Sequence, residues 1–462
     1  MAPDLLLDGA TVVTMDGGRT EHAVGHVVIE NGRIAAVGAG PAPESLGPRT
    51  DLSGCLITPG LVNTHHHLYQ WVTRGLAVDD GLFGWLTTLY PIWGRIDADV
   101  VGAAAEAGLA WLARTGCTTS TDHHYVFPAD GGDVLGAEIE AARRVGLRFM
   151  PTRGSMDLGR KDGGLPPDHV VEDIDTILAA SAAAVDAHHD PGPDSMLRIG
   201  LAPCSPFSVT GELLRQAAAL ARDKGVRLHT HLAETTDEEQ FCRERFGRTP
   251  VEYMESLGWL GPDVWLAHGI HFDDDAIKRL AETGTGVAHC PTSNARLGAG
   301  IARTVDLRAA GVPVGLGVDG AASNEACSLI EELRHALLFA RARGGPLALA
   351  VRDALELGTI GGARLLGWDD QIGSLEVGKQ ADIAVWRLDG LGHADIVDPV
   401  AALVLGAAPP LELLLVGGDP VVESDRLVTV DEQDLTHRAV AAHGRLLARA
   451  GSVTGQQERN HS

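Results

Sequence analysis

The sequence lacks the cysteine patterns that mark disulfide frameworks and cysteine-based zinc sites. Its six cysteines are scattered along 462 residues and form no CxxC pair: Cys55, Cys117, Cys204, Cys242, Cys290 and Cys327. This spacing is typical of reduced thiols in a cytosolic protein. It also excludes the HxE…PCxxC pattern of one class of zinc deaminases.

Segments that address a chain to a membrane are absent as well. Residues 1–4 are not followed by the basic and apolar regions of a signal peptide. No apolar run reaches membrane-spanning length without charges or turn residues. We therefore expect a cytoplasmic protein with no membrane partner.

Basic residues are scarce relative to acidic ones. The chain has 37 Lys and Arg against 62 Asp and Glu, which gives a formal net charge of −25. Such a field repels phosphate backbones, so we expect no nucleic-acid partner.

Residues 1–58 have the pattern of short apolar runs and turns that is typical of β-strands. Residues 26–30 and 34–37 are apolar runs that meet across Asn31-Gly32, a strong hairpin signal. A similar texture returns over residues 372–430. Because chain termini of a domain often lie close together, we expect 1–58 and 372–430 to form one small β-sandwich.

Between these segments, strands alternate with helices. Apolar β-rich runs that end in polar residues occur at Gly60–His67, Thr118–Tyr125, Leu147–Ser155, Leu197–Ser205, Val226–Glu234, Val264–His271, Gly286–Asn294 and Val312–Gly320. Eight such units predict an α/β fold, a (β/α)8 TIM barrel over residues 59–371. A last helix is predicted over 431–450 and a disordered tail over 451–462.

Metal-binding side chains cluster at the ends of the predicted strands. His65 and His67 lie two apart on the first strand, so both imidazoles point into the barrel and His66 points outward. The fifth strand ends in His231, followed by Glu234, and the sixth supplies His268. Asp319 ends the eighth strand.

Carboxyl ends of barrel strands meet at the active-site face, so these side chains should converge. Histidines and a carboxylate without thiolates suit a divalent cation such as zinc or iron. A lone histidine is more often structural; the metal-site hypothesis therefore depends on the whole constellation. For His66, His123, His124, His271 and His289 we favour orienting or structural roles.

A glycine pattern invites a different interpretation. Residues 315–320, Gly-Leu-Gly-Val-Asp-Gly, match GxGxxG. This run closes the predicted barrel instead of opening a βαβ unit, so it does not indicate nucleotide binding.

Four motifs together resemble the amidohydrolase superfamily: Pro-Gly-Leu-Val-Asn-Thr-His-His-His at 59–67, His-Leu-Ala-Glu at 231–234, Leu-Ala-His at 266–268 and Gly-Val-Asp-Gly at 317–320. More narrowly, the sequence is similar to the branch that holds 8-oxoguanine deaminases and the triazine aminohydrolases and chlorohydrolases. Shared stretches include residues 122–125, 153–156, 161–167 and 202–210.

The resemblance implies site roles. It assigns His65, His67, His231 and Asp319 as metal ligands, and Glu234, His268 and Asp319 as catalytic groups in the attack of metal-bound hydroxide. Dinuclear members carry a lysine on strand four, and residues 198–205 contain none. We therefore expect one divalent metal ion, zinc or iron. Leu68 departs from the branch, which usually has an aromatic residue there.

The implied reaction is conversion of 8-oxoguanine to urate and ammonia by a homo-oligomeric enzyme acting on a small heterocycle. Predicted substrate-binding residues are Gln70, Arg74, Arg153 and Cys204, which follow the metal histidines or end strands three and four. A triazine aminohydrolase or chlorohydrolase, similar to hydroxyatrazine enzymes, is the alternative. A non-catalytic relative is a more distant one, because no metal ligand is missing.

Overall fold

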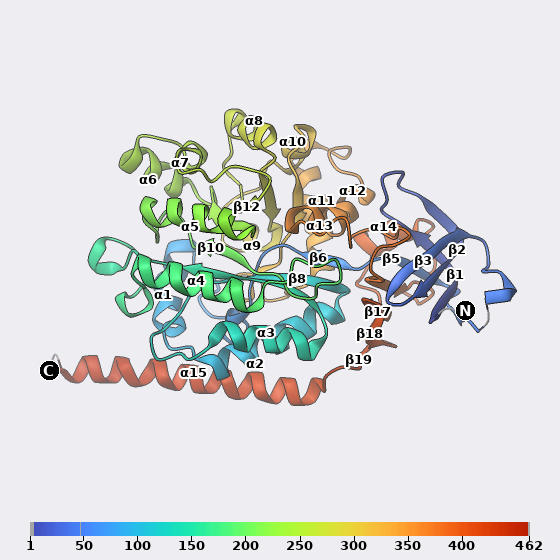
Figure 1. The fold of residues 1–462 in the computed structure, drawn as a ribbon, viewed down its shortest axis with the longest axis horizontal. Coiled ribbons are helices and arrows are strands. Elements are labelled where there is room, and N and C mark those ends of the chain that lie inside the picture. The colour runs from blue at the N-terminus through green and yellow to red at the C-terminus, as the bar shows by residue number, and fades with distance from the viewer. Residues whose placement is uncertain (1–3, 47, 461–462) are drawn as a thin grey trace.

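A closed parallel barrel forms the centre of the molecule (Figure 1). The structure is a computed structural model that describes residues 4–46 and 48–460. The barrel strands are β6 (Leu61–Asn63), β8 (Cys117–His124), β9 (Arg148–Ser155), β10 (Gly200–Pro203), β11 (Leu228–Leu232), β12 (Val264–His268), β13 (Gly286–His289) and β14 (Val314–Leu316). Each overlaps one of the eight predicted runs, and their order around the barrel follows the chain. The predicted barrel is confirmed.

Helices surround these strands. They are α2 (Ala98–Arg114), α3 (Val134–Val145), α4 (Ile174–His188), α5 (Gly211–Lys224), α6 (Thr236–Phe246), α7 (Pro250–Ser256), α8 (Asp274–Thr283), α9 (Pro291–Arg296), α10 (Thr304–Ala309), α11 (Leu329–Gly344), α12 (Val351–Leu357) and α13 (Ile360–Leu366). In α5, the Thr210 hydroxyl accepts the Leu213 amide at the start, and Gly225 ends the helix in the left-handed region. Its apolar face is buried against the barrel core.

The two terminal β segments form one continuous nine-stranded sheet. Its strands are β1 (Leu5–Val13), β2 (Glu21–Glu30), β3 (Arg33–Ala39), β4 (Thr50–Asp51), β5 (Cys55–Pro59), β16 (Ile383–Arg387), β17 (Leu411–Val416), β18 (Asp419–Glu423) and β19 (Arg426–Leu427). The helix α14 (Pro399–Leu405) lies between β16 and β17 in sequence.

The two halves join where β5 pairs with β16, and the Asn31-Gly32 hairpin forms as predicted. Backbone hydrogen bonds join the β2–β3 hairpin to the segment just before β16: the Ile34 N–H donates to the Lys379 carbonyl, and the Ala381 N–H donates to the Gly32 carbonyl. These segments cover a shared apolar core. The predicted sandwich is thus a single sheet that curls on itself, because the hydrogen-bonded β5–β16 pair leaves no break between two sheets.

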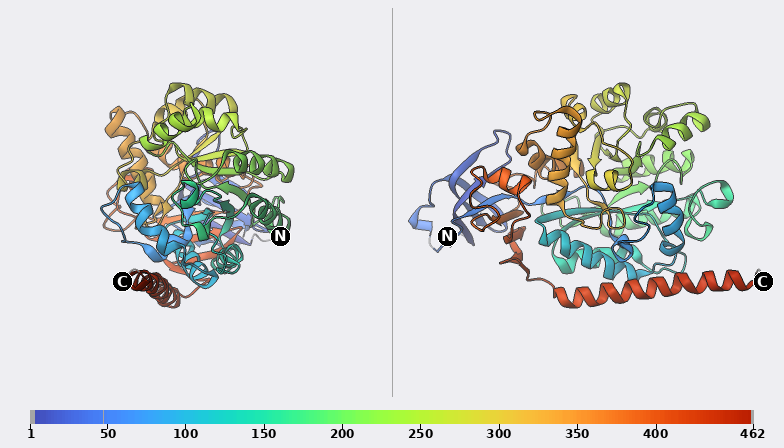
Figure 2. Two further views of the ribbon diagram at one scale, coloured as in Figure 1. Left: turned by 90° about the vertical axis from the view of Figure 1, so that its left-hand side faces the viewer. Right: turned by 180° about the vertical axis from the view of Figure 1, so that it is seen from behind.

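The last helix, α15 (Glu432–Asn460), lies along the outside of the barrel and contacts α2 (Figure 2). It was expected to end at residue 450, with a disordered tail after it. The helical backbone instead continues to Asn460, since no proline follows Gly451 to stop it. Residues 461–462 lie outside the described residues. Within the part of the chain described here, no helix has both the length and the apolar character that crossing a membrane requires.

Candidate metal centre and active site

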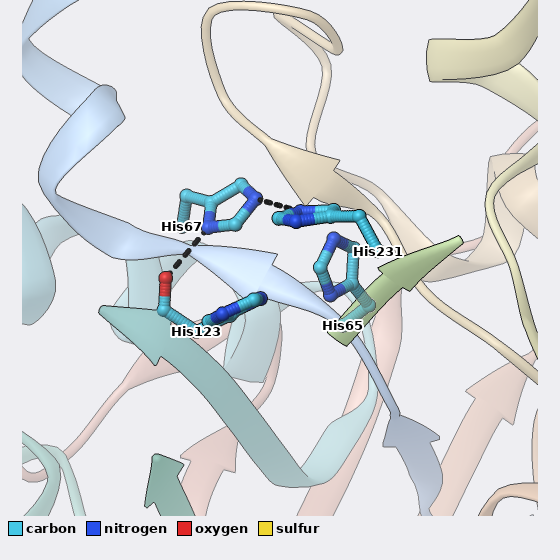
Figure 3. A group of neighbouring side chains, drawn as sticks. All are labelled: His65, His67, His123 and His231. Atoms are coloured by element: carbon cyan, nitrogen blue, oxygen red, sulfur yellow. Dashed lines mark hydrogen bonds between the residues drawn. The ribbon is translucent and has the colours of Figure 1, made fainter. Parts of the chain in front are cut away.

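The first strand and the last strand of the barrel meet at a short extension above the barrel rim. There β7 (His66–His67) pairs with β15 (Asp319–Gly320), with Asp319 opposite His66. This pairing places Asp319 Oδ1 3.1 Å from His65 Nε2 and 3.3 Å from His67 Nε2. His231, on β11, completes the group, and its Nε2 lies 3.1 Å from His67 Nε2 (Figure 3).

Hydrogen bonds fix which nitrogen of each ring carries the proton. His67 donates from Nδ1 to the His123 carbonyl at 2.7 Å, as Figure 3 shows. His231 donates from Nδ1 to the Cys204 carbonyl at 2.7 Å. Both Nε2 atoms therefore present lone pairs to each other across 3.1 Å, where neither can donate. Two such lone pairs repel unless a cation lies between them.

The third imidazole is oriented through a residue that the sequence analysis missed. His229 donates from Nδ1 to the Trp265 carbonyl at 2.8 Å, so its Nε2 accepts a proton from His65 Nδ1 at 2.8 Å. His65 Nε2 then carries a lone pair, and this buried atom has no hydrogen-bond partner in the part of the chain that the structure describes. His229 lies two residues before His231, on the same face of the strand, and this spacing could have identified it from the sequence.

The carboxylate is held from its other side. Ser293 donates a hydrogen bond to Asp319 Oδ2 at 2.6 Å, and Ser323 donates to the same oxygen at 3.2 Å. Burial opposes ionisation of Asp319, but its interactions with His65 and His67 outweigh burial and hold its pKa well below the usual value. Burial also lowers the pKa of His65 to about 4, so this ring is neutral at physiological pH.

These donors fit a divalent cation. Two overlapping groups of candidate ligand atoms share His65 and His231: one adds His67 and His123, and the other adds His268 and Asp319. Neutral imidazoles with one carboxylate, and no thiolate, are the donor set of zinc and related metals. The predicted ligands His65, His67, His231 and Asp319 are brought together in one place.

Two proton-handling side chains lie beside this centre. Glu234 follows Ala233, a residue in the left-handed region at φ 53°, and His268 itself has φ 73°. These turns bring His268 Nε2 to 3.8 Å from Glu234 Oε2. Burial raises the pKa of Glu234. Burial lowers that of His268, but the charges of Glu234 and Asp319 outweigh it, so the His268 pKa is raised.

His67, His231 and Asp319 line the same pocket as Glu234 and His268. Its polar lining comes from His67, Gln70, Cys204, Ser205, Ser208, His231, Glu234, Glu238, His268 and Asp319. Its apolar walls are Leu82, Trp85, Leu86 and Tyr90 of α1 (Leu82–Trp93), together with Tyr125, Leu165, Phe207 and Leu297. Gln70 is fully buried, and among the described residues neither its amide oxygen nor its amide nitrogen has a hydrogen-bond partner.

Two predicted substrate residues are placed elsewhere. The Arg74 guanidinium stacks over Trp71, 3.6 Å from the ring centre, and lines a separate surface hollow beside α15. Arg153 forms two 2.8 Å hydrogen bonds with Glu172 and lies over Phe127. The expectation that these arginines face the pocket is corrected, because nearby aromatic rings and Glu172 satisfy them instead. Gln70 and Cys204 do line it.

The other histidines have mainly orienting contacts. His123 donates from Nε2 to the Ala202 carbonyl at 2.9 Å and stacks on His231, with the ring centres 4.6 Å apart. His124 contacts the buried Glu138 at 2.7 Å, and His271 donates to the Ala299 carbonyl. Burial lowers the pKa of His66 and of His289 to about 3. Neither ring lines the pocket.

Comparison of the sequence with known proteins identifies a matching family and similar enzymes. A model described as the amidohydrolase family matches residues 56–420. An 8-oxoguanine deaminase from Pseudomonas aeruginosa is 48% identical over 430 residues, which cover 92% of this chain and 96% of the relative. A hydroxydechloroatrazine ethylaminohydrolase from Pseudomonas sp. strain ADP is 36% identical, with 91% of each chain covered.

A solved structure of similar shape is that of an atrazine chlorohydrolase from Arthrobacter aurescens TC1 complexed with zinc. It superimposes with a TM-score of 0.90 at 33% identity, covering 95% of this chain and all of the other. The likeness extends over both the barrel and the nine-stranded sheet.

Proposed function

Because this chain belongs to the amidohydrolase family, and is a hydrolase of that family, we propose that it deaminates 8-oxoguanine to urate and ammonia. The observation that carries the proposal is the shared pocket: Glu234 and His268 face the same space as His67, His231 and Asp319. The 48% identity to an 8-oxoguanine deaminase favours this ring over others.

We propose that His65, His67, His231 and Asp319 hold one divalent ion, zinc or alternatively iron. A bound cation of this kind acts as a Lewis acid that lowers the pKa of water and polarises the reacting centre. Two of the three candidate ligand groups overlap at one centre, which supports a single ion there; the third, formed by Asp122, His124 and Glu138, shares no residue with them. The fourth barrel strand, β10, supplies no lysine to bridge a second one.

The chain's own residues then handle the protons of hydrolysis. Glu234, whose pKa is raised by burial, donates a proton to the ring nitrogen beside the amino-bearing carbon and makes that carbon electrophilic. Asp319 accepts a proton from the attacking water, and His268 holds the attacking oxygen by a hydrogen bond. Delivery of a proton to the exocyclic nitrogen breaks the C–N bond, so that water is consumed, ammonia leaves and a carbonyl remains.

Gln70 supports a ring that carries amide-like edges. Its unpartnered carboxamide offers one acceptor and one donor group at the pocket wall, which complements a ring N–H beside a carbonyl. The apolar walls suit the faces of a flat heterocycle. No Lys or Arg among the described residues lines the pocket, which favours an uncharged ring over a phosphorylated substrate.

The second candidate is hydrolysis of an alkylamino or chloro substituent from a triazine. The largely apolar walls, contributed by α1 and by Phe207, are the observation that favours it, because an alkyl substituent gains from burial there. The related ethylaminohydrolase and chlorohydrolase support the same alternative.

Release of the leaving group across a panel of rings separates the candidates, measured as ammonia for the amino-substituted rings and as the alkylamine for hydroxyatrazine. The panel comprises 8-oxoguanine, guanine, isocytosine, adenine, cytosine, melamine and hydroxyatrazine, each with zinc-loaded enzyme. We expect the highest kcat/KM with 8-oxoguanine. A higher kcat/KM with a triazine, or no ammonia from 8-oxoguanine, would reject the proposed substrate and leave the metal-dependent hydrolase in place.

A further inference from the structure

The short helix α9 contacts both sides of the reaction centre through two consecutive residues. Ser293 donates to Asp319 Oδ2, as described above, and Asn294 Oδ1 lies 3.0 Å from His268 Nδ1. Successive helical residues point about 100° apart. Since α9 follows β13, which pairs with both β12 and β14, one residue reaches Asp319 beyond β14 while the next reaches His268 at the end of β12.

The side chain of His268 needs such an anchor. Its backbone has φ 73°, in the region that side-chain-bearing residues rarely adopt, so the ring is aimed by a strained turn. Among the described residues, the bond to Asn294 is the one hydrogen bond made by the His268 ring; Glu234 lies farther away, at 3.8 Å. The contact at Nδ1 therefore decides what Nε2 presents to the pocket.

Asn294 is fixed in place but is poorly suited to a purely structural role. It is 1% exposed, its backbone N–H bonds to the Cys290 carbonyl, and its own carbonyl accepts the Ala299 N–H. Its Nδ2 is buried, and no residue in the described ranges 4–46 and 48–460 forms a hydrogen bond with it. A half-satisfied buried amide costs stability that an apolar residue of the same size would not cost. The side-chain hydrogen bond that Asn294 does form is the one with His268.

We propose that Asn294 is a positioning residue for His268. Its Oδ1 accepts the Nδ1 proton, which fixes the ring angle and the tautomer, and so leaves Nε2 to meet the attacking oxygen. The consequence for catalysis rests on the proposed function, whereas the tautomer of His268 does not.

The first test compares two replacements at this position. Asn294→Leu keeps the volume and removes the acceptor, and Asn294→Asp keeps an acceptor oxygen. We expect Asn294→Leu to retain metal content and Tm, to lower kcat by about 10–100-fold and to leave KM within about twofold, the scale found for partners that orient site histidines. Asn294→Asp should recover most of the lost kcat.

A matched control is Thr304→Val on α10, which also removes a buried polar atom that has no hydrogen-bond partner. It should leave kcat unchanged. Wild-type kcat in Asn294→Leu, or Asn294→Asp no better than Asn294→Leu, would overturn the proposal. If the leucine variant fails to fold, Asn294→Ala and Asn294→Asp give the same comparison.

The second test needs no turnover, so it separates failure of this proposal from failure of the proposed reaction. Zinc-loaded protein labelled with 15N-histidine is studied by NMR at alkaline pH, and the His268 signals are assigned from their loss in His268→Gln. We expect a protonated Nδ1 and an unprotonated Nε2 in the wild type, and a mixture of tautomers in Asn294→Leu. An unprotonated Nδ1 in the wild type would show that the amide donates, which contradicts the proposal.

Discussion

The proposed proton-transfer role of Glu234 depends on both its position and its pKa. It stands one residue beyond a left-handed turn, and burial raises its pKa while the nearby His268 opposes that shift. The carboxyl is close to the metal group but is not among the candidate ligand atoms. Its loss should therefore affect proton transfer without affecting the metal.

Glu234→Gln should retain one metal ion per chain and lose about 10²–10⁴-fold in kcat, the usual contribution of a proton shuttle. Elemental analysis and steady-state kinetics on the same preparation measure both quantities. Glu244→Gln is the control, because this exposed residue of the following helix α6 bears the same change in charge. Near wild-type kcat in Glu234→Gln would contradict the assigned role.

Gln70 and Arg74 make a second comparison, because both were predicted to bind substrate and only Gln70 lines the pocket. Gln70→Ala should lower kcat/KM for 8-oxoguanine by roughly 10–100-fold, as expected when polar ring edges lose their partner. Arg74→Ala should leave kcat/KM unchanged. Equal losses in the two variants would show that pocket contact does not explain the effect.

At the scale of elements, the sequence predicted what periodic patterns encode. The run that became β12, Val264–His268, is apolar up to its terminal histidine, and such a pattern specifies both a barrel strand and its inner end. The position of His268 at that end followed directly. The walls supplied by α1 and by Leu165 could not be predicted, because long loops place their side chains through tertiary packing that no local period reports.

Two further elements were beyond prediction for similar reasons. β7 and β15 are two residues long, so no periodicity exists to detect them, although their pairing brings Asp319 to the histidines. Arg74 and Arg153 were predicted to bind substrate from their positions in the sequence alone. In the structure they form cation–π contacts with Trp71 and Phe127 and do not line the pocket.

The glycines that mimic a nucleotide-binding motif have a packing role in the structure. A Cβ on Gly317 would lie 2.6 Å from His65 Cβ and 3.0 Å from His65 N. A Cβ on Gly320 would lie 1.9 Å from Gln70 Oε1. The last barrel strand can approach the first, with the predicted ligand His65, only because these side chains are absent.

Gly317→Ala should therefore displace His65, weaken metal binding and destabilise the fold by about 1–3 kcal/mol, as overpacking does. Metal content after dialysis and Tm by calorimetry measure the two effects. Gly444→Ala in α15 is the control, because a Cβ there meets no atom within 4 Å; it should leave metal content unchanged and raise stability slightly. Unaltered metal content in Gly317→Ala would contradict this account.

For the whole molecule, the metal centre connects elements that are far apart in sequence. The four predicted ligands, His65, His67, His231 and Asp319, come from the first, fifth and eighth barrel strands or their extensions. Without a cation, the facing lone pairs of His67 and His231 repel, and this repulsion opposes closure of the barrel rim. A bound ion that favours the folded state stabilises the entire fold by mass action.

Removal of metal with a chelator should lower Tm and abolish activity, and one equivalent of zinc per chain should restore both. Titration followed by calorimetry and elemental analysis gives the stoichiometry. His65→Ala should show the low Tm regardless of added zinc. Restoration that required two equivalents per chain would contradict a single-ion centre.

Stability as a function of pH depends on carboxyl groups buried away from the metal, of which Glu332 on α11 is one. It is fully buried, and it accepts hydrogen bonds from the Thr292 N–H at 3.1 Å and from Asn324 Nδ2 at 2.8 Å. Burial outweighs these bonds and raises its pKa from 4.5 to about 8. Between these two pH values the unfolded chain loses the Glu332 proton while the folded chain keeps it.

The contribution of Glu332 to the free energy of unfolding should consequently be full below pH 4.5, decline up to about pH 8 and stay constant above. Glu332→Gln cannot ionise, so its stability relative to wild type should rise across that window by an amount on the order of a few kcal/mol. Urea unfolding at pH 5, 6.5 and 8 measures the difference, and comparison with Glu331→Gln, the partly exposed neighbour, removes the general effect of charge. Other buried carboxyls, such as Glu238, titrate in both proteins and cancel. A stability difference that stayed flat from pH 5 to 8 would mean that Glu332 is ionised throughout, held by Thr292 and Asn324 more strongly than burial opposes it.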